Sequence, residues 1–286
     1  MQISFIGAGR VGVSLGKYFK EQGRKIGGYY SLSPESARWA AKFTNTKQYQ
    51  TLKEVISSSD MIFFTVPDDQ IKGVWEEAKP DVSGKIIAHC SGIHSSKIFS
   101  DIERTGSIAY SIHPLCAISD KETSYELLYD TTFTIEGDTQ NISKIKTMFA
   151  QMNNTTIIIS AENKTKYHAA ASLASNHITA VFFMAQKLFL ECGFTKEQAK
   201  KELYQLASQN LLNIYKQGCI DSLTGPVERN DVSTVEAHIH ALNPDLKEAY
   251  LKNAKQLVEI AQQKNPDRDY SRMCRILLEP QRMEEI

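Results

Sequence analysis

The chain has 286 residues, with 33 basic and 33 acidic side chains, so its formal charge is balanced. A balanced charge excludes the basic surface expected of a nucleic-acid-binding protein. The most apolar stretch, residues 178–190, is interrupted by Gln186 and Lys187 and is too short to span a membrane. Five cysteines without C-x-x-C spacing argue against a disulfide framework and a zinc site, so we expect no metal.

The length is sufficient for one large domain or two ordinary ones. A predicted strand starts within two residues of Met1, which leaves no room for a signal peptide. The sequence therefore predicts a cytoplasmic protein with neither a nucleic-acid nor a membrane partner.

A glycine-rich turn near the start of the chain is the most informative motif. The apolar run Ile3–Ile6 leads into Gly7-x-Gly9-x-x-Gly12, and helical spacing follows. A strand, a tight turn and a helix in this order are typical of a dinucleotide-binding site. Gly7 permits the turn, Gly9 lets the backbone approach a pyrophosphate, and Gly12 lets helix and strand pack closely. The predicted cofactor-binding residues of this helix N-terminus, whose N–H groups attract an anion, are Gly7, Ala8, Gly9, Arg10, Val11 and Gly12.

The residues after the second predicted strand, Lys25–Tyr30, favour NADP over NAD. An NAD site usually has an acidic residue here that binds the ribose hydroxyls, and this chain has none. Ser31 and Ser33 can donate hydrogen bonds to a 2′-phosphate, although Leu32 stands where an arginine would help. Ser33, followed by Pro34, is also a typical helix N-cap, and the two roles are compatible.

A buried strand at about residues 60–65 is predicted to end beside the cofactor. In open α/β sheets, ligands bind beyond the carboxyl ends of the strands. We therefore expect Val66 and Pro67, which follow this strand, to line the cofactor site. Asp68 either caps a helix or binds the ligand.

Polar residues follow two further predicted strands, Lys85–His89 and 108–112. Ser91 is expected to hydrogen-bond the substrate or the nicotinamide. His113 either binds the substrate or has a structural role, and the same two possibilities hold for His89 and His94.

The first part of the chain alternates β-rich runs with helical patterns, which predicts a parallel sheet. Strands at 131–135 and 155–159 flank a helix at about 140–152 and complete this sheet. From residue 161 the pattern is helical. The predicted fold is therefore α/β: a Rossmann-type, mostly parallel sheet domain (residues 1–160) followed by a smaller all-α domain (161–286) for substrate binding and dimerisation.

A long helix is predicted over residues 167–179. His168, Ser172 and Asn176 are spaced i, i+4, i+8 and therefore share one face of it. The surrounding alanines and serines would let the helix pack closely against the sheet domain, so this polar face suits the wall of a cleft. The alternative is a row of interhelical hydrogen bonds inside a bundle.

The remaining chain predicts helices at about 196–217, 244–263 and 270–278, with a polar turn after the first of them. In that turn Arg229 forms an ion pair with Asp231 or binds a substrate carboxylate in a bidentate manner. Ser233 is the predicted N-cap of the next helix. The apolar stripe of the helix at 244–263 is either bundle core or dimer surface.

The whole chain resembles the Rossmann-like proteins with a C-terminal domain of unknown function 2520, relatives of the 6-phosphogluconate dehydrogenase-type C-terminal fold. Besides the glycine motif, the resemblance rests on the segments Val66–Asp68, Cys90–Ser96, His113–Leu115, Tyr167–Ala171, Ala174–Asn176 and Thr224–Asp231. Some bacterial members act as ketopantoate reductases, so the resemblance implies an NADPH-dependent reductase of a small carbonyl acid. It also implies a homodimer formed through the helical half.

The proton donor is where the chain departs from the better-known ketopantoate reductases. Those enzymes carry a catalytic lysine at the start of a K-x-x-x-N-x-x-x-N helix. In this chain His168 stands at the lysine position and Ser172 at the first asparagine position. Lys166 would face another side of the helix, and Glu236 is out of register with their catalytic glutamate.

The leading hypothesis is hydride transfer from NADPH to a small keto acid, first of all 2-dehydropantoate (ketopantoate), in pantothenate biosynthesis. His168 would donate the proton, because its ordinary pKa lies near neutrality, while Asn176 and Ser91 orient the carbonyl. The predicted substrate-binding residues are Ser172, His113 and Arg229. Two alternatives are the reduction of a cyclic imine, as in pyrroline-5-carboxylate reductase, and a regulatory protein that binds NADP without turnover.

Overall fold

A computed structural model describes residues 1–278 of the chain. The chain forms two compact units, residues 1–177 and a second unit that begins at Ile178. The sheet ends at Ile158, but the units divide between His177 and Ile178 rather than at residue 160. The helix after the sheet is therefore grouped with the first unit.

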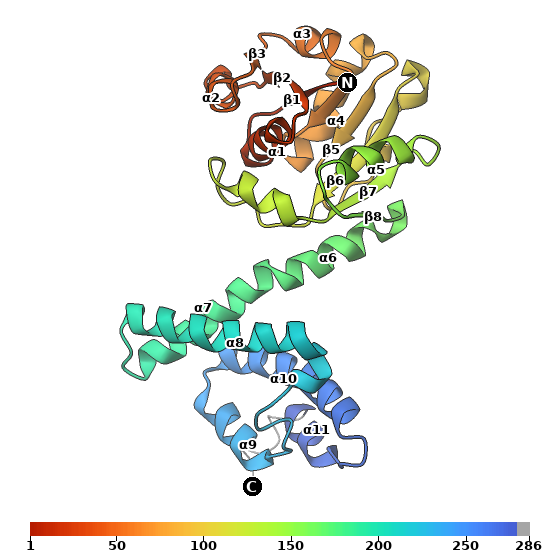
Figure 1. The fold of residues 1–286 in the computed structure, drawn as a ribbon. Helices are drawn as coiled ribbons and strands as arrows, with labels where there is room; N and C mark the ends of the chain where they lie inside the picture. The colour runs from red at the N-terminus through yellow and green to blue at the C-terminus, as the bar shows by residue number, and fades with distance from the viewer. Residues whose placement is uncertain (279–286) are drawn as a thin grey trace. The chain divides into compact units, whose positions relative to one another are not determined.

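The first unit is built on an eight-stranded sheet of order β3-β2-β1-β4-β5-β6-β7-β8 (Figure 1). Neighbouring strands are parallel except for the antiparallel pair β6 and β7. The fold class predicted from the sequence is confirmed. The strands are β1 Gln2–Ile6, β2 Lys25–Tyr30, β3 Lys47–Gln48, β4 Met61–Phe64, β5 Ile86–His89, β6 Ile108–Pro114, β7 Phe133–Gly137 and β8 Thr156–Ile158.

The first five helices of this unit cover the two faces of the sheet, and the sixth follows its last strand. They are α1 Arg10–Glu21, α2 Pro34–Thr44, α3 Leu52–Ser57, α4 Ile71–Ala78, α5 Ile142–Ala150 and α6 Lys164–Ala174. Short 3₁₀ turns are η1 Asp68–Gln70, η2 Lys79–Asp81, η3 Ser96–Ile98, η4 Ile102–Thr105, η5 Ser124–Asp130 and η6 Ala161–Asn163.

Two apolar cores lie on opposite faces of the sheet, because successive strand residues point to opposite sides. In β4, Phe63 packs with residues of α1, α2 and α5, whereas Phe64 packs with residues of α3 and α4. Both rings are fully buried. The rigid sheet fixes where the loops at the strand ends meet.

The strand order reverses between β1 and β4, since β2 and β3 lie on one side of β1 and β4 to β8 on the other. Such a switch point leaves a crevice at the carboxyl ends of the strands, which is where open α/β sheets bind ligands. The glycine turn follows β1 and therefore lies at this crevice.

The second unit is helical, as predicted. Its helices are α7 Asn176–Glu191, which begins at the end of the first unit, α8 Lys196–Ser222, α9 Val232–Ala241, α10 Pro244–Lys264 and α11 Ser271–Leu278. Its core joins side chains of α9, α10 and α11, such as Val235, Val258 and Met273. None of the helices in residues 1–278 combines the length and apolar character that crossing a membrane requires.

Several local predictions were wrong. The helix predicted over residues 167–179 is interrupted at Ser175, whose φ of −128° and ψ of −77° are not helical, so Asn176 starts a new helix. Ser233 does not cap α9, because Asp231 accepts the hydrogen bond from the Thr234 N–H. The two-residue strand β3 carries too little pattern to be predicted.

Candidate functional site

The glycine turn is locked against the end of β4. Gly7 has a φ of +109°, a conformation that favours glycine, and a Cβ there would lie 2.6 Å from the carbonyl carbon of Thr65. A Cβ on Gly12 would collide with the Thr65 hydroxyl, which donates a hydrogen bond to the Gly7 carbonyl at 2.9 Å. As the motif predicts, Gly7 permits the tight turn and Gly12 permits the close packing of helix on strand.

Gly9 leaves the start of α1 open. It is the N-cap residue and has no side chain, and the nearest atom to a Cβ built on it is 3.9 Å away. The N–H groups of the first helical turn, beginning at Arg10, therefore donate no hydrogen bond to a capping side chain. Free N–H groups at a helix N-terminus are suited to a phosphate group.

A cavity of about 180 Å³ lies on one side of the turn. Six of the predicted cofactor residues line it, namely Gly7, Ala8, Gly9, Ser31, Val66 and Pro67.

The hydroxyls of the two predicted phosphate-binding serines both accept hydrogen bonds from the backbone. Ser31 Oγ accepts from the Ser33 N–H, and Ser33 Oγ caps α2 by accepting from the Ser36 N–H. Accepting these bonds leaves the proton of each hydroxyl free for donation. Ser33 is an N-cap as predicted, but it does not line the cavity.

A second cavity, of about 750 Å³, contains most of the predicted substrate residues. Arg10, His113, His168, Ser172 and Asn176 line it, and all belong to the first unit. The volume is that of a small-molecule site. Residues of the glycine turn line both cavities, so a dinucleotide whose pyrophosphate sits on α1 would have one end in each.

A histidine and a tyrosine are hydrogen-bonded in the wall of this second cavity. His113 Nδ1 lies 2.7 Å from Tyr167 Oη. Burial, helped by the charge of Lys164, lowers the pKa of His113 to about 4, so its imidazole is neutral at pH 7. Burial raises the pKa of Tyr167, which therefore keeps its proton. Tyr167 was not among the predicted site residues, since nothing in its spacing marks its hydroxyl as facing a cavity.

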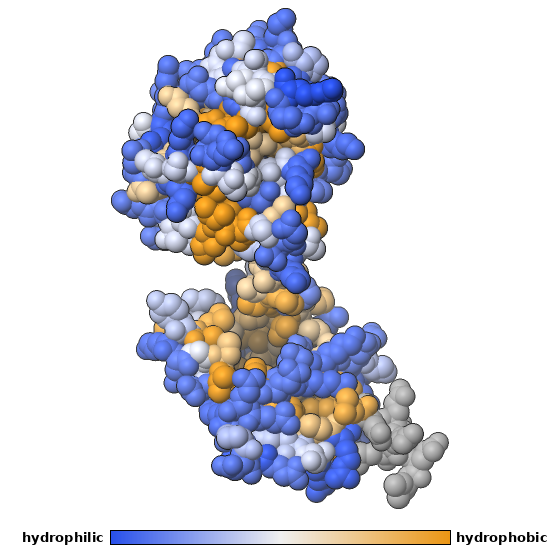
Figure 2. Space-filling model, turned by 90° about the vertical axis from the view of Figure 1, so that its right-hand side faces the viewer, coloured by the Kyte–Doolittle hydropathy of each residue, from blue (hydrophilic) through white to orange (hydrophobic). Residues whose placement is uncertain are grey.

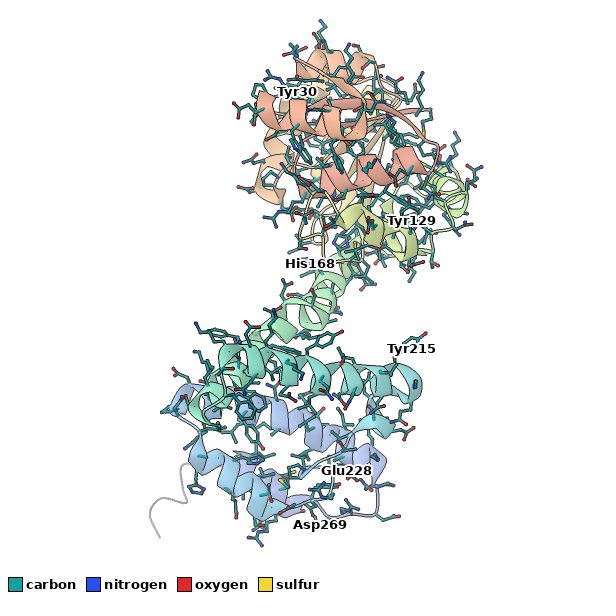
Figure 3. All side chains as sticks on the ribbon, turned by 60° about the vertical axis from the view of Figure 1, so that its left-hand side comes forward. Tyr30, Tyr129, His168, Tyr215, Glu228 and Asp269 are labelled. Carbon is teal, nitrogen blue, oxygen red and sulfur yellow. The ribbon has the colours of Figure 1, made fainter. Side chains whose placement is uncertain are left out.

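His168 projects from the first half of α6 (Figure 3). Its Nδ1 is buried and has no hydrogen-bond partner among residues 1–278. The ring lies against Gly92, where any side chain would collide with it. Because Nδ1 faces the protein, Nε2 is the ring nitrogen available to a ligand in the cavity.

Ser91 lines neither of the two cavities and is only 5% exposed. Its hydroxyl donates to Asp68 Oδ2 at 2.6 Å and accepts from the N–H groups of Ile93 and His94. The hydroxyl has one proton to donate, and it is used in the hydrogen bond to Asp68. In this structure Ser91 therefore organises the loop after β5, and Asp68 neither caps η1 nor stands free.

Lys164, the first residue of α6, is a functional candidate that sequence reasoning missed. It is 1% exposed, and its Nζ donates to the Ser91 carbonyl at 2.8 Å and to Ser111 Oγ at 2.6 Å. Burial lowers its pKa to about 8. No motif could have identified it, because a lysine at the start of a helix is ordinarily exposed.

Two other candidates, His89 and Arg229, line neither of the two cavities. His89 is buried, its Nδ1 accepts from the Ser91 N–H at 3.1 Å, and burial lowers its pKa to about 3, which fits a structural residue. Arg229 lies in the second unit, in the turn before α9. Within residues 1–278 it forms no salt bridge with Asp231, and its binding of a carboxylate stays a prediction.

Comparison with known proteins identifies the parts of the chain. Residues 1–114 match the family model of the Rossmann-like domain, and residues 131–257 match that of a domain of unknown function, DUF2520. No curated protein matches the chain.

Solved structures share the fold over nearly the whole chain. Protein TM1727 from Thermotoga maritima is 27% identical, with a TM-score of 0.73 over 92% of this chain and 99% of that one. A putative NADP oxidoreductase from Bacteroides fragilis is 19% identical, with a TM-score of 0.75 over 90% and 98%. Plasmodium falciparum pyrroline carboxylate reductase with NADP bound is 16% identical, with a TM-score of 0.61 over 92% and 96%.

The low pKa of His113 predicts a pH dependence of stability. Between its folded pKa of about 4 and the ordinary value of 6.5, the unfolded chain binds more protons than the folded one. The free energy of unfolding therefore falls as pH is lowered through this window, by up to about 1.4 kcal/mol per pH unit for one proton. His113→Asn, which keeps a polar group near Nδ1, should reduce this slope.

Urea unfolding can measure this slope for the first unit alone, because both tryptophans, Trp39 and Trp75, lie there and report by fluorescence. His177→Asn is the matched control, because it makes the same substitution at an exposed histidine of the same unit. Equal slopes for wild type and His113→Asn would contradict the assignment of a low pKa to His113.

Proposed function

We propose that this chain, a Rossmann-like domain joined to a DUF2520 domain, is an NADPH-dependent reductase of a small keto acid. The first candidate substrate is 2-dehydropantoate, in which case the enzyme serves pantothenate biosynthesis in the cytoplasm. The observation that carries the proposal is the position of the glycine turn. One cavity beside it is lined by glycines and Ser31, and the other by His113, His168 and Asn176.

The preference for NADP rests on the residues that follow β2. The end of β2 has no carboxylate that would repel a 2′-phosphate. Ser31 and Ser33 each have a hydroxyl proton free to donate to such a group. The pyrophosphate would lie on the N–H groups at the start of α1.

The reaction needs a proton as well as a hydride, and NADPH supplies only the hydride. In the proposed reaction His168 donates the proton from Nε2 to the oxygen of the former carbonyl. Ser172 and Asn176, in the same cavity, bind and orient the substrate. Arg10 brings a positive charge to this wall, and no acidic residue among residues 1–278 lines it, which suits a carboxylate substrate.

Reduction of a cyclic imine is the second candidate. It is favoured by the shared fold with a pyrroline carboxylate reductase. The same cavity would then hold the imine, and the proton would go to nitrogen. A regulatory protein that binds NADP without turnover is the third possibility, and the polar wall around His168 argues against it.

The decisive test is NADPH oxidation with 2-dehydropantoate, other 2-keto acids and pyrroline-5-carboxylate. We expect turnover with a keto acid, and a loss of about 100- to 10,000-fold in His168→Ala, because a positioned proton donor contributes that much. His177→Ala is the control, since its side chain is exposed. Full activity of His168→Ala would remove His168 from the mechanism. Turnover of the imine alone would establish the second candidate, and tight NADPH binding without oxidation the third.

We also propose that the protein is a homodimer formed through its second unit. None of the residues of α7 is buried. Figure 2 shows apolar side chains on the surface of this unit. Those on α7 and α8 that are at least 37% exposed are Val181, Phe183, Leu190, Tyr204, Leu206, Leu211, Leu212, Tyr215 and Ile220. So much exposed apolar surface is typical of a face that another chain covers.

Sedimentation velocity tests the dimer. We expect the wild type to sediment as a dimer, and Leu206→Asp/Leu211→Asp to sediment as a monomer, because two charges would lie in the apolar interface. Gln263→Asp adds a charge at an exposed polar position of α10, outside the apolar residues of α7 and α8, and serves as the control. A monomeric wild type would contradict the proposal.

A further inference from the structure

Lys164 is a buried cation without an ion pair. Its side chain starts at the first residue of α6 and is 1% exposed. None of the salt bridges formed by residues 1–278 includes it. A buried charge without a direct partner is costly, so a protein retains one where it has a use.

The lysine joins three elements of the first unit: α6, the loop after β5, and β6. Its Nζ donates to the carbonyl of Ser91, in the loop after β5, and to Ser111 Oγ, in β6. Ser111 Oγ in turn donates to the same Ser91 carbonyl at 3.2 Å. The carbonyl of the Ser91–Gly92 peptide is thus held by hydrogen bonds from α6 and β6.

This peptide supports the proposed proton donor. Gly92 follows Ser91 directly, and the imidazole of His168 lies against it. The Ser91 hydroxyl, bonded to Asp68, fixes the other side of the loop. A displacement of the Ser91 carbonyl would therefore move the surface on which His168 rests.

The fold itself does not need the charge. In a Lys164→Met variant, Ser111 would still donate to the Ser91 carbonyl, so that acceptor would keep a partner. Replacing a buried, unpaired charge by an apolar side chain of similar length is often neutral or stabilising.

The charge also acts on the groups around it. Lys164 interacts electrostatically with five titratable side chains, namely Asp68, His89, Cys90, His113 and Glu136. Glu136 is occupied by hydrogen bonds from Ser96, and His89 is buried. His113 is the member of this group that lines the larger cavity, and the charge of Lys164 adds to burial in disfavouring its protonation.

We propose that Lys164 is the positioning residue of this site: it touches no ligand and holds the Ser91–Gly92 peptide against which His168 packs. The effect on turnover rests on the proposed reductase function. The effects on the loop and on His113 do not.

Lys164→Met tests the proposal, with Lys166→Met, an exposed lysine of the same helix, as the control. We expect kcat to fall about 10- to 100-fold in Lys164→Met, the size of effect that a small misplacement in an active site causes. NADPH affinity should be unchanged, and the thermal midpoint unchanged or higher. The difference in kcat between wild type and Lys164→Met should shrink as pH rises through about 8, where Lys164 loses its proton, whereas a limb due to His168 would be common to both proteins.

A second measurement does not depend on turnover. Histidine side-chain NMR of the full chain should show a higher pKa for His113 in Lys164→Met than in the wild type, and a changed signal of His168. A lower thermal midpoint with a parallel loss of NADPH binding would make Lys164 a structural residue and overturn the proposal. Unchanged kcat would overturn it too.

If the wild type turns over none of the substrates, the reductase proposal fails while the NMR titration still decides the role of Lys164. Unchanged His113 and His168 signals in Lys164→Met would then refute it.

Discussion

The packing of the glycine turn against Thr65 is the constraint on which the rest of the site depends. Gly7 and Gly12 are both in contact with this residue, and its hydroxyl bonds back to the Gly7 carbonyl. Because β1 and β4 are neighbours at the point where the strand order reverses, this contact places the start of α1 at the crevice of the sheet. Both cavities adjoin this helix end, since Gly9 lines the smaller one and Arg10 lines the larger one.

Much of the first unit could be predicted because its signals are local. The strand–turn–helix of the glycine motif, the strand Lys25–Tyr30 and the cap at Ser33 each follow from a few adjacent residues, and the structure contains all three. His168 and Ser172 share a face by simple helical spacing, and both line the larger cavity. Asn176 reaches the same cavity although the helix breaks before it.

The features that could not be predicted depend on contacts between distant parts of the chain. Ser91 was expected to hydrogen-bond the substrate or the nicotinamide, but its hydroxyl donates a hydrogen bond to Asp68, which precedes it by 23 residues. Lys164 is 73 residues away from the carbonyl that it holds. The pairing of Tyr167 with His113 likewise exists only once α6 has packed beside β6. In each case the sequence shows the residue type but not its hydrogen-bond partner, which is distant along the chain.

Together these contacts describe a site with two kinds of residue. His168, Ser172 and Asn176 line the larger cavity. A hydrogen-bonded set, made of the exposed Asp68 and the buried Ser91 and Lys164, fixes the loop against which His168 packs. Such a second layer of support is what holds reacting groups within the narrow tolerance that catalysis requires. The cost of burying an unpaired lysine is consistent with this purpose.

In the proposed complex the cofactor bridges the two cavities, with its reactive ring beside His168. A crystal structure of the protein with NADP⁺ bound tests this most directly. We expect the pyrophosphate on the N–H groups at the start of α1, the 2′-phosphate near Ser31 and Ser33, and nicotinamide C4 in the cavity lined by His113 and His168. A nicotinamide ring outside that cavity, or one whose C4 faces only apolar side chains, would contradict it.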